Sequence, residues 1–222
     1  MQDYPKLLPR GTAVSFTQFS REHAFSAVKN AIADGADKQK SGNAAEVAAT
    51  GEQDMYAWNV QMLQSVGAKV GQVEEKIYRG IKVQSTPKVI FSPNFGVTQA
   101  EVASKLSEKV TITPTSTLLI DGEQIQLRSL SLDGTLIIHA HPLAKVTVDG
   151  LTIHNGGWAF SELNDDTEKS VEQKYAIRGY TLDRKEQAYF RFDQAGEYIL
   201  NDETRSKYET KEYQHGARRP SQ

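Results

Sequence analysis

The stretch from Thr117 to Phe160 constrains the fold most, because short apolar runs alternate there with tight-turn dipeptides. The turn dipeptides are Asp121-Gly122, Asp133-Gly134, Asp149-Gly150 and Asn155-Gly156. Asp-Gly and Asn-Gly accept a positive φ at low cost, so each marks a reversal or a corner of the chain. Their spacing is too irregular for a strict solenoid. We therefore expect a layer or coil of short strands, either an imperfect β-coil or a small sandwich.

Composition narrows the class of protein. The chain has 222 residues, enough for one large or two small domains. It contains no cysteine, which excludes disulfides, thiol catalysis and cysteine-based zinc sites and is consistent with a cytoplasmic location. The formal net charge of -2 gives no long-range attraction to nucleic acid or to an anionic membrane. No segment approaches the ~20 apolar residues of a membrane span. We expect neither nucleic acid nor membrane as a partner.

Three zones follow one another along the chain. Residues 1–85 mix helical and strand patterns, and residues 86–200 hold one short helix and then many strands. Residues 201–222 are polar and lack apolar periodicity, so we expect a disordered tail. The fold class expected for the whole chain is α+β.

A helix is expected from Gly51 to Val66. Thr50 can cap its start, and Gln53 stands three residues later, where a capping-box partner belongs. The following apolar residues have helical spacing, and Gly67 is a natural stop.

A second helix is expected from residue 99 to about residue 106. Thr98 and Glu101 have the same capping-box spacing, and Val97 and Val102 stand at the two positions of a hydrophobic staple. The run Lys88–Phe91 before it has the pattern of a buried strand.

Two places could carry chemistry with phosphate groups. Lys29 follows a possible strand over 24–28 and precedes a loop of small and polar residues, so its ammonium could meet negative charge on a phosphate. The alternative is a solvated surface lysine. The helix start at Thr50, Gly51 and Glu52 could bind an anion through free N–H groups, with Gly51 allowing close approach. The alternative there is ordinary helix capping.

Five blocks of sequence, taken in order, resemble one family. They are Asp3-Tyr4-Pro5-Lys6-Leu7, Val28-Lys29-Asn30, Thr50-Gly51-Glu52, Ser129-Leu130-Ser131-Leu132-Asp133-Gly134 and Ile177-Arg178-Gly179-Tyr180. The resemblance spans about residues 2–200 and is to the UDP-sugar pyrophosphorylases, which are nucleotidyltransferases of nucleotide-sugar biosynthesis. They are similar in turn to the UDP-glucose and UDP-N-acetylglucosamine pyrophosphorylases.

The resemblance implies transfer of a uridylyl group from UTP to a sugar 1-phosphate with release of pyrophosphate. Lys29 matches the lysine of the family's P-V-K-N motif, although Ala27 replaces the proline. Asn30 and the block of Thr50, Gly51 and Glu52 are expected to contact substrate. The family's Gly-rich nucleotide loop does not occur here, and no metal ligand is expected in this chain. Mg²⁺ would be bound mainly by an N-terminal part that this chain does not contain.

The same resemblance implies a fold for each zone. Residues 1–85 would be the C-terminal segment of a Rossmann-like, GT-A-type nucleotidyltransferase domain, and residues 86–200 a β-rich, left-handed β-helix-like domain. We therefore expect an incomplete and inactive fragment, with exposed apolar surface around Met55, Trp58 and Met62. The alternatives are a non-catalytic β module for assembly or binding and, within the superfamily, a UDP-glucose or UDP-N-acetylglucosamine pyrophosphorylase. The preferred sugar and the oligomeric state are left open.

Overall fold

The computed structural model describes residues 3–20, 24–164 and 171–210. Helices and parallel sheets occur together, which fits the expected α+β class. The elements are η1 (Tyr4–Leu7), α2 (Ile32–Lys40), α3 (Ala48–Ser65), β1 (Lys69–Val70), β2 (Glu74–Tyr78), β3 (Ile81–Ser85), β4 (Lys88–Phe91), α4 (Gln99–Ser104), β5 (Val110–Ile112), β6 (Thr117–Asp121), β7 (Ile125–Asp133), β8 (Thr135–Ala140), β9 (Ala144–His154), β10 (Trp158–Glu162), α6 (Gln173–Ala176), β11 (Tyr180–Arg184), β12 (Ala188–Phe192), β13 (Gly196–Leu200) and α7 (Arg205–Tyr208).

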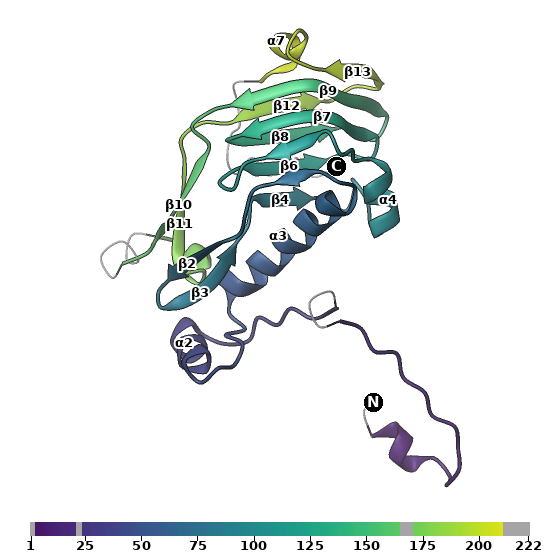
Figure 1. Cartoon of the computed structure of the whole chain (residues 1–222), viewed down its shortest axis with the longest axis vertical. Helices are drawn as coiled ribbons and strands as arrows, with labels where there is room; N and C mark the ends of the chain where they lie inside the picture. Colours follow the sequence, from purple (N-terminus) through teal and green to yellow (C-terminus); the bar gives the residue numbers. More distant parts are fainter. Residues whose placement is uncertain (1–2, 21–23, 165–170, 211–222) are drawn as a thin grey trace.

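Most strands belong to two parallel sheets that form a coil. One sheet has the order β1-β5-β7-β9-β13 and the other β12-β8-β6-β4. From β4 to β9, successive strands fall in alternate sheets, and β12 and β13 continue the alternation (Figure 1). All neighbours in both sheets pair in parallel. Of the two architectures expected from the sequence, the structure therefore has the coil of strands and not the small sandwich.

The two long strands of the coil, β7 and β9, show why the sequence folds this way. Along both, buried apolar residues alternate with exposed ones, as a sheet with one face in the core requires. The parallel register places apolar residues of β7 beside apolar residues of β9, so that Leu127 pairs with Val148 and Leu132 with Ile153. The pairing of β7 with β9 shifts its register near Ser129, and both strands continue through this irregularity.

The corner between β7 and β8 needs a glycine. Gly134 has a φ of +123°, and a Cβ there would lie 2.2 Å from Asn155 Oδ1. That oxygen accepts hydrogen bonds from the N–H groups of Thr135 (2.8 Å) and Gly157 (3.0 Å), and Asn155 Nδ2 donates to Thr135 O (3.0 Å). At the neighbouring corner, the positive φ falls on Gly157 rather than on the expected Gly156.

Helix α3 lies along β4, the edge strand of one sheet (Figure 1). Leu63 is fully buried and shares a hydrophobic cluster with Val89 of β4. The prediction of an exposed apolar face was therefore wrong for Met62, which is only 5% exposed, and right for Met55, which is 45% exposed. Trp58 is partly buried against the same cluster. The coil supplies the surface that α3 covers.

The capping predictions hold in part. Thr98 caps α4 by accepting from Glu101 N (3.2 Å), as expected, but Val97 is 82% exposed and makes no staple. Helix α3 begins three residues before the expected start, with Val47 at the N-cap. Thr50 stands inside the first turn, where its hydroxyl bonds back to Val47.

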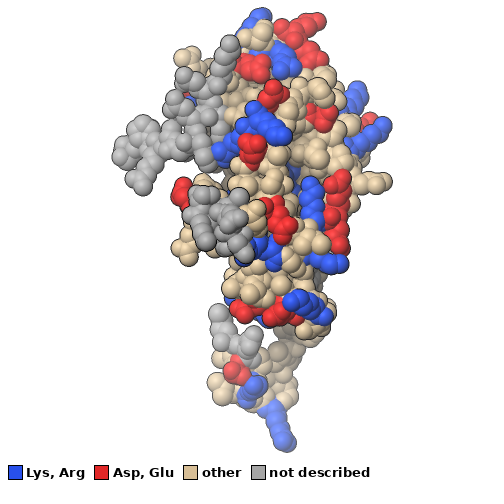
Figure 2. All heavy atoms as spheres, turned by 90° about the vertical axis from the view of Figure 1, so that its left-hand side faces the viewer, with Lys and Arg blue, Asp and Glu red and all other residues tan. Residues whose placement is uncertain are grey.

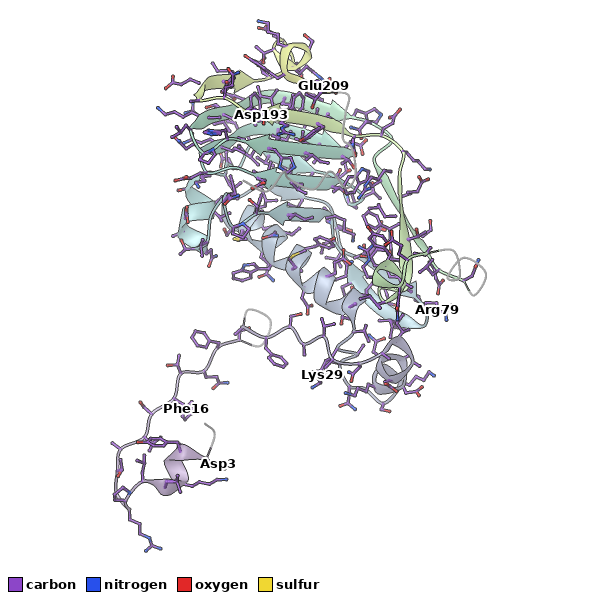
Figure 3. The ribbon with its side chains drawn as sticks, turned by 180° about the vertical axis from the view of Figure 1, so that it is seen from behind. Asp3, Phe16, Lys29, Arg79, Asp193 and Glu209 are labelled. Atoms are coloured by element: carbon purple, nitrogen blue, oxygen red, sulfur yellow. The ribbon has the colours of Figure 1, made fainter. Side chains whose placement is uncertain are left out.

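The N-terminal segment differs from expectation. Residues 3–20 run away from the body of the molecule, and Phe16 is 88% exposed (Figure 3). No strand forms over 24–28, because the described residues provide no neighbouring strand for it to pair with.

The C-terminal segment also differs. Residues 201–210, assigned to a disordered tail, contain α7 and are tied to the coil. Asp202 Oδ1 accepts from Thr152 N (2.7 Å), and Thr210 N donates to Tyr189 O (2.9 Å). The rest of the expected tail, 211–222, lies outside the described residues.

Gly134→Ala should destabilise the protein more than Gly150→Ala. Both glycines have positive φ, so each substitution strains the backbone by about 1 kcal/mol. A Cβ at residue 150 meets nothing within 4 Å, whereas one at residue 134 displaces Asn155 and breaks hydrogen bonds worth about 1 kcal/mol each. Urea unfolding of both variants measures the difference. Equal free energies of unfolding would show that the Asn155 corner contributes nothing.

Candidate functional site

Lys29 and Asn30 are held against the loop that leads into α3. Their two backbone N–H groups both donate to Glu46 O, at 2.9 and 3.1 Å. The Asn30 side chain donates to Ala45 O at 2.7 Å. Lys29 lies near α2, far from Asp193 and Glu209 at the other end of the coil (Figure 3). The structure therefore brings two predicted site residues to the start of α3, and their contacts with substrate stay a prediction.

The side chain of Glu46 forms ion pairs with two lysines. Its Oε2 lies 3.0 Å from Lys29 Nζ and 3.7 Å from Lys38 Nζ. Glu46 is largely buried, and its backbone has a positive φ of 52° that sets the turn into α3. The Lys29 side chain is 58% exposed, so a phosphate from solution can reach its ammonium. Sequence analysis missed both Glu46 and Lys38, because no local pattern marks a pairing that the fold creates.

The structure places Thr50, Gly51 and Glu52 inside α3 rather than at the open helix start that the sequence suggested, and their contacts with substrate stay a prediction. The N–H of Gly51 is already bonded to Val47 O (3.0 Å). A Cβ at Gly51 would lie 2.4 Å from Val28 Cγ2, so the space that was expected to admit an anion is filled by the Val28 side chain. Gly51 is therefore a packing residue, while Thr50 borders the pocket described below.

Glu52 has a structural environment that the sequence did not indicate. Its Oε1 accepts from Tyr56 OH (2.5 Å) and from Arg178 Nη1 (3.3 Å), and its Oε2 accepts from Tyr180 OH. Burial and the Glu52 charge raise the pKa values of Tyr56 and Tyr180. With three donors, this carboxylate ties α3 to β11 across 128 residues of sequence, and it has little capacity left for a substrate.

A buried lysine stands beside this network. Lys88, at the start of β4, is 5% exposed and donates to Gln53 Oε1 (3.1 Å), Ser85 Oγ (2.9 Å) and Thr86 O (2.9 Å). Its ammonium also lies 5.3 Å from the centre of the Tyr56 ring. Burial, and secondarily the charge of Lys76, lower the Lys88 pKa to about 8. The available sequence signal was a charged residue heading an otherwise apolar strand.

A pocket of about 400 Å³ lies beside these residues. Segments before α2, before α3 and in β3 contribute to it, together with the exposed face of α3. It is lined by Phe25, Ser26, Ala27, Gln39, Ala44, Ala45, Glu46, Thr50, Gln53, Asp54, Ala57, Trp58, Gln61, Lys82, Val83 and Gln84. Glu46 lines the pocket and pairs with Lys29, so it links the pocket to the Lys29 ammonium, which is not itself part of the lining.

No group of three or more His, Cys, Asp or Glu side chains is placed to hold a metal ion in the ranges 3–20, 24–164 and 171–210. Within the same ranges, none of the helices combines the length and the apolar character needed to cross a membrane. On the face shown in Figure 2, acidic and basic side chains are interspersed.

Comparison with known proteins supports the resemblance seen in the sequence. No family model matches the chain. It is 33% identical over 202 residues to a UDP-sugar pyrophosphorylase of Arabidopsis thaliana, a match that covers 91% of this chain and 32% of the relative. It is 34% identical over 187 residues to UDP-sugar pyrophosphorylases of Oryza sativa subsp. indica and subsp. japonica, covering 84% of this chain and 30% of each relative. The chain thus resembles UDP-sugar pyrophosphorylases over most of its own length and spans about a third of theirs.

Lys88 should make stability depend on pH in a specific window. Its folded-state pKa of about 8 is below the ordinary 10.5, so between these values the unfolded chain keeps a proton that the folded chain has released. The free energy of unfolding therefore rises with pH, by about 2 kcal/mol between pH 8 and 10. Above pH 10 the raised pKa values of Tyr56 and Tyr180 act in the opposite direction.

Urea unfolding from pH 7 to pH 10 measures this contribution. The Lys88→Met variant should lose the rise, since it removes the titrating group and keeps a long apolar side chain. The same slope in both proteins would contradict the depressed pKa.

Proposed function

We propose that this chain is part of a UTP-dependent uridylyltransferase that forms UDP-sugars from sugar 1-phosphates and releases pyrophosphate. The observation that carries the proposal is the match of 84–91% of the chain to three proteins named UDP-sugar pyrophosphorylase. The exposed ammonium of Lys29 beside a 400 Å³ pocket supports it, because such a site can hold a phosphate and the group attached to it.

The reaction requires positioning and charge stabilisation more than covalent chemistry from the protein. A phosphate oxygen of the sugar 1-phosphate attacks the α-phosphorus of UTP, and the bond from that phosphorus to the bridging oxygen breaks as pyrophosphate leaves. Negative charge gathers on the phosphoryl oxygens. Lys29 would meet this charge by exchanging its ion pair with Glu46 for one with phosphate, and Lys38 would keep Glu46 paired.

Several finer features belong to the same proposal. We place the chain in the C-terminal portion of such an enzyme, with residues 1–85 completing the catalytic domain and the coil wound left-handed. Asn30 and Thr50 would lie near the substrate, and the cytoplasm would be the location. Mg²⁺ would be bound mainly by the part of the enzyme outside the match.

A non-catalytic module for assembly or binding is the second candidate. It is favoured by the fact that the matches leave about two-thirds of each relative uncovered. In that case the pocket and Lys29 would have no part in turnover.

A chimera separates the two candidates. This chain is joined to the part of the Arabidopsis relative that lies outside the match, and pyrophosphate release from UTP and glucose 1-phosphate is measured. We expect turnover that falls about 10²- to 10³-fold in Lys29→Ala, because a charge-stabilising contact is lost. Lys40→Ala, an exposed lysine of α2 paired with Asp37, is the matched control and should change little. Equal turnover in Lys29→Ala and the parent would exclude the role of Lys29, and a folded but inactive parent chimera would favour the non-catalytic module.

A further inference from the structure

Gln53 is a buried polar residue with an incomplete set of hydrogen bonds. It stands in the second turn of α3, is 4% exposed and borders the pocket. Its Oε1 accepts from Lys88, whereas its Nε2 has no hydrogen-bond partner among the described residues. A buried N–H group without an acceptor is rare, because desolvating it without replacing its bond to water is unfavourable. Gln53 Nε2 therefore needs an acceptor that the described part of the chain does not supply.

Lys88 fixes which end of the Gln53 amide faces it. An ammonium can only donate, so the amide oxygen must point toward Lys88 and the NH₂ group away from it. Lys88 cannot turn aside, because its other hydrogen bonds go to Ser85 and Thr86. The Tyr56 and Phe160 rings also lie 5.3 and 5.4 Å from its Nζ. The pair thus keeps an amide donor at the pocket wall in one orientation.

The rest of the pocket indicates which ligand would accept from that donor. Glu46 and Asp54 contribute carboxylates, and Ser26 Oγ already donates to Asp54 Oδ2 at 2.7 Å. The lysine in the lining, Lys82, is paired with Glu75 at 3.3 Å, and two lysines outside the lining pair with Glu46. Because these charges already have partners, the pocket suits a neutral ligand that carries both donors and acceptors.

Aromatic and amide side chains in the lining favour a sugar among such ligands. Trp58 offers an apolar ring, and Gln61 and Gln84 share the lining with Gln53. Gln39 also lines the pocket, but both ends of its amide are bonded to the backbone of Lys82. A monosaccharide presents hydroxyl groups that donate and accept, together with apolar C–H faces that pack on an aromatic ring.

We propose that this pocket binds the sugar ring of the substrate, and that Gln53, held in orientation by Lys88, donates to one oxygen of that ring and selects for it. The inference rests on the proposed function and deepens it: the sugar would lie in the carboxylate-lined pocket while its phosphate meets Lys29 on the other side of Glu46. Gln53 Nε2 is shielded from water in the free protein. The ligand oxygen would reach it through a small rotation that keeps Oε1 on Lys88. Gln53 is the contacting residue and Lys88 the positioning residue.

The test uses methyl α-glucoside, a neutral sugar without phosphate, titrated into the ¹⁵N-labelled chain and followed by NMR. The side-chain NH₂ resonances of Gln53, assigned by their loss in Gln53→Glu, should shift downfield as the sugar saturates the pocket. The indole N–H of Trp58 gives the dissociation constant independently. Gln53→Glu should weaken binding about tenfold, because it replaces the donor with an acceptor and keeps the shape of the side chain.

Gln64→Glu is the matched control, because Gln64 is an exposed glutamine of the same helix that lies outside the pocket lining. It adds the same charge and should bind nearly as tightly as the parent. Lys88→Met should abolish the downfield shift of the Gln53 resonances while the backbone resonances of the coil stay in place. If that variant fails to fold, Gln53→Glu alone decides.

The proposal is overturned if methyl α-glucoside leaves the Gln53 and Trp58 resonances unmoved, or if Gln53→Glu binds it as tightly as Gln64→Glu. Lys29→Ala should not change binding of this phosphate-free sugar. Sugar binding without turnover in the chimera would mean that the proposed function has failed and the pocket has not. Turnover in the chimera together with unchanged sugar binding in Gln53→Glu would mean that the proposed function holds and the sugar-pocket proposal has failed.

Discussion

The packing of α3 on the edge strand β4 is the interaction on which the rest of the structure depends. An open sheet edge presents unpaired backbone groups, and α3 covers this one. Asn59 Nδ2 donates to Val89 O at 2.9 Å, and the fully buried Leu63 enters the same hydrophobic cluster as the coil. The helix therefore serves as the first layer of the coil as well as the support of the site.

Everything in the candidate site is positioned from that helix. Its first turn receives Val28 against Gly51, which places the neighbouring Lys29 beside the loop at Glu46. Its second turn carries Gln53 to Lys88 of β4. Glu52, between these contacts, binds Tyr180 and so fixes β11 to the same helix. A shift of α3 along β4 would move the phosphate contact, the pocket and the network together.

Local signals predicted the coil and the helices, but tertiary contacts decide the site. Alternating apolar residues and the corners at Asp121-Gly122 and Asp133-Gly134 were enough to predict a coil of strands, because period-two burial and turn chemistry are local properties. The corner expected at Asp149-Gly150 was wrong, since both residues lie inside β9. Thr50 looked like an N-cap, yet the helix starts earlier because Ala49 is buried in a cluster with Tyr78 and Ile81. The partners of Lys88 and Glu52 lie up to 128 residues away, and no local pattern encodes such pairs.

Native-state hydrogen exchange tests most directly whether α3 and the coil form one cooperative unit. The amides of residues 57–63 in α3 should exchange with the same opening free energy as those of β7 and β9, because all of them share one hydrophobic cluster. With increasing urea, the opening free energies of the α3 amides and of the β7 and β9 amides should converge together on the free energy of global unfolding. Fast exchange in α3 while β7 and β9 stay protected would show that the helix opens independently, and it would contradict the dependence of the site on the coil.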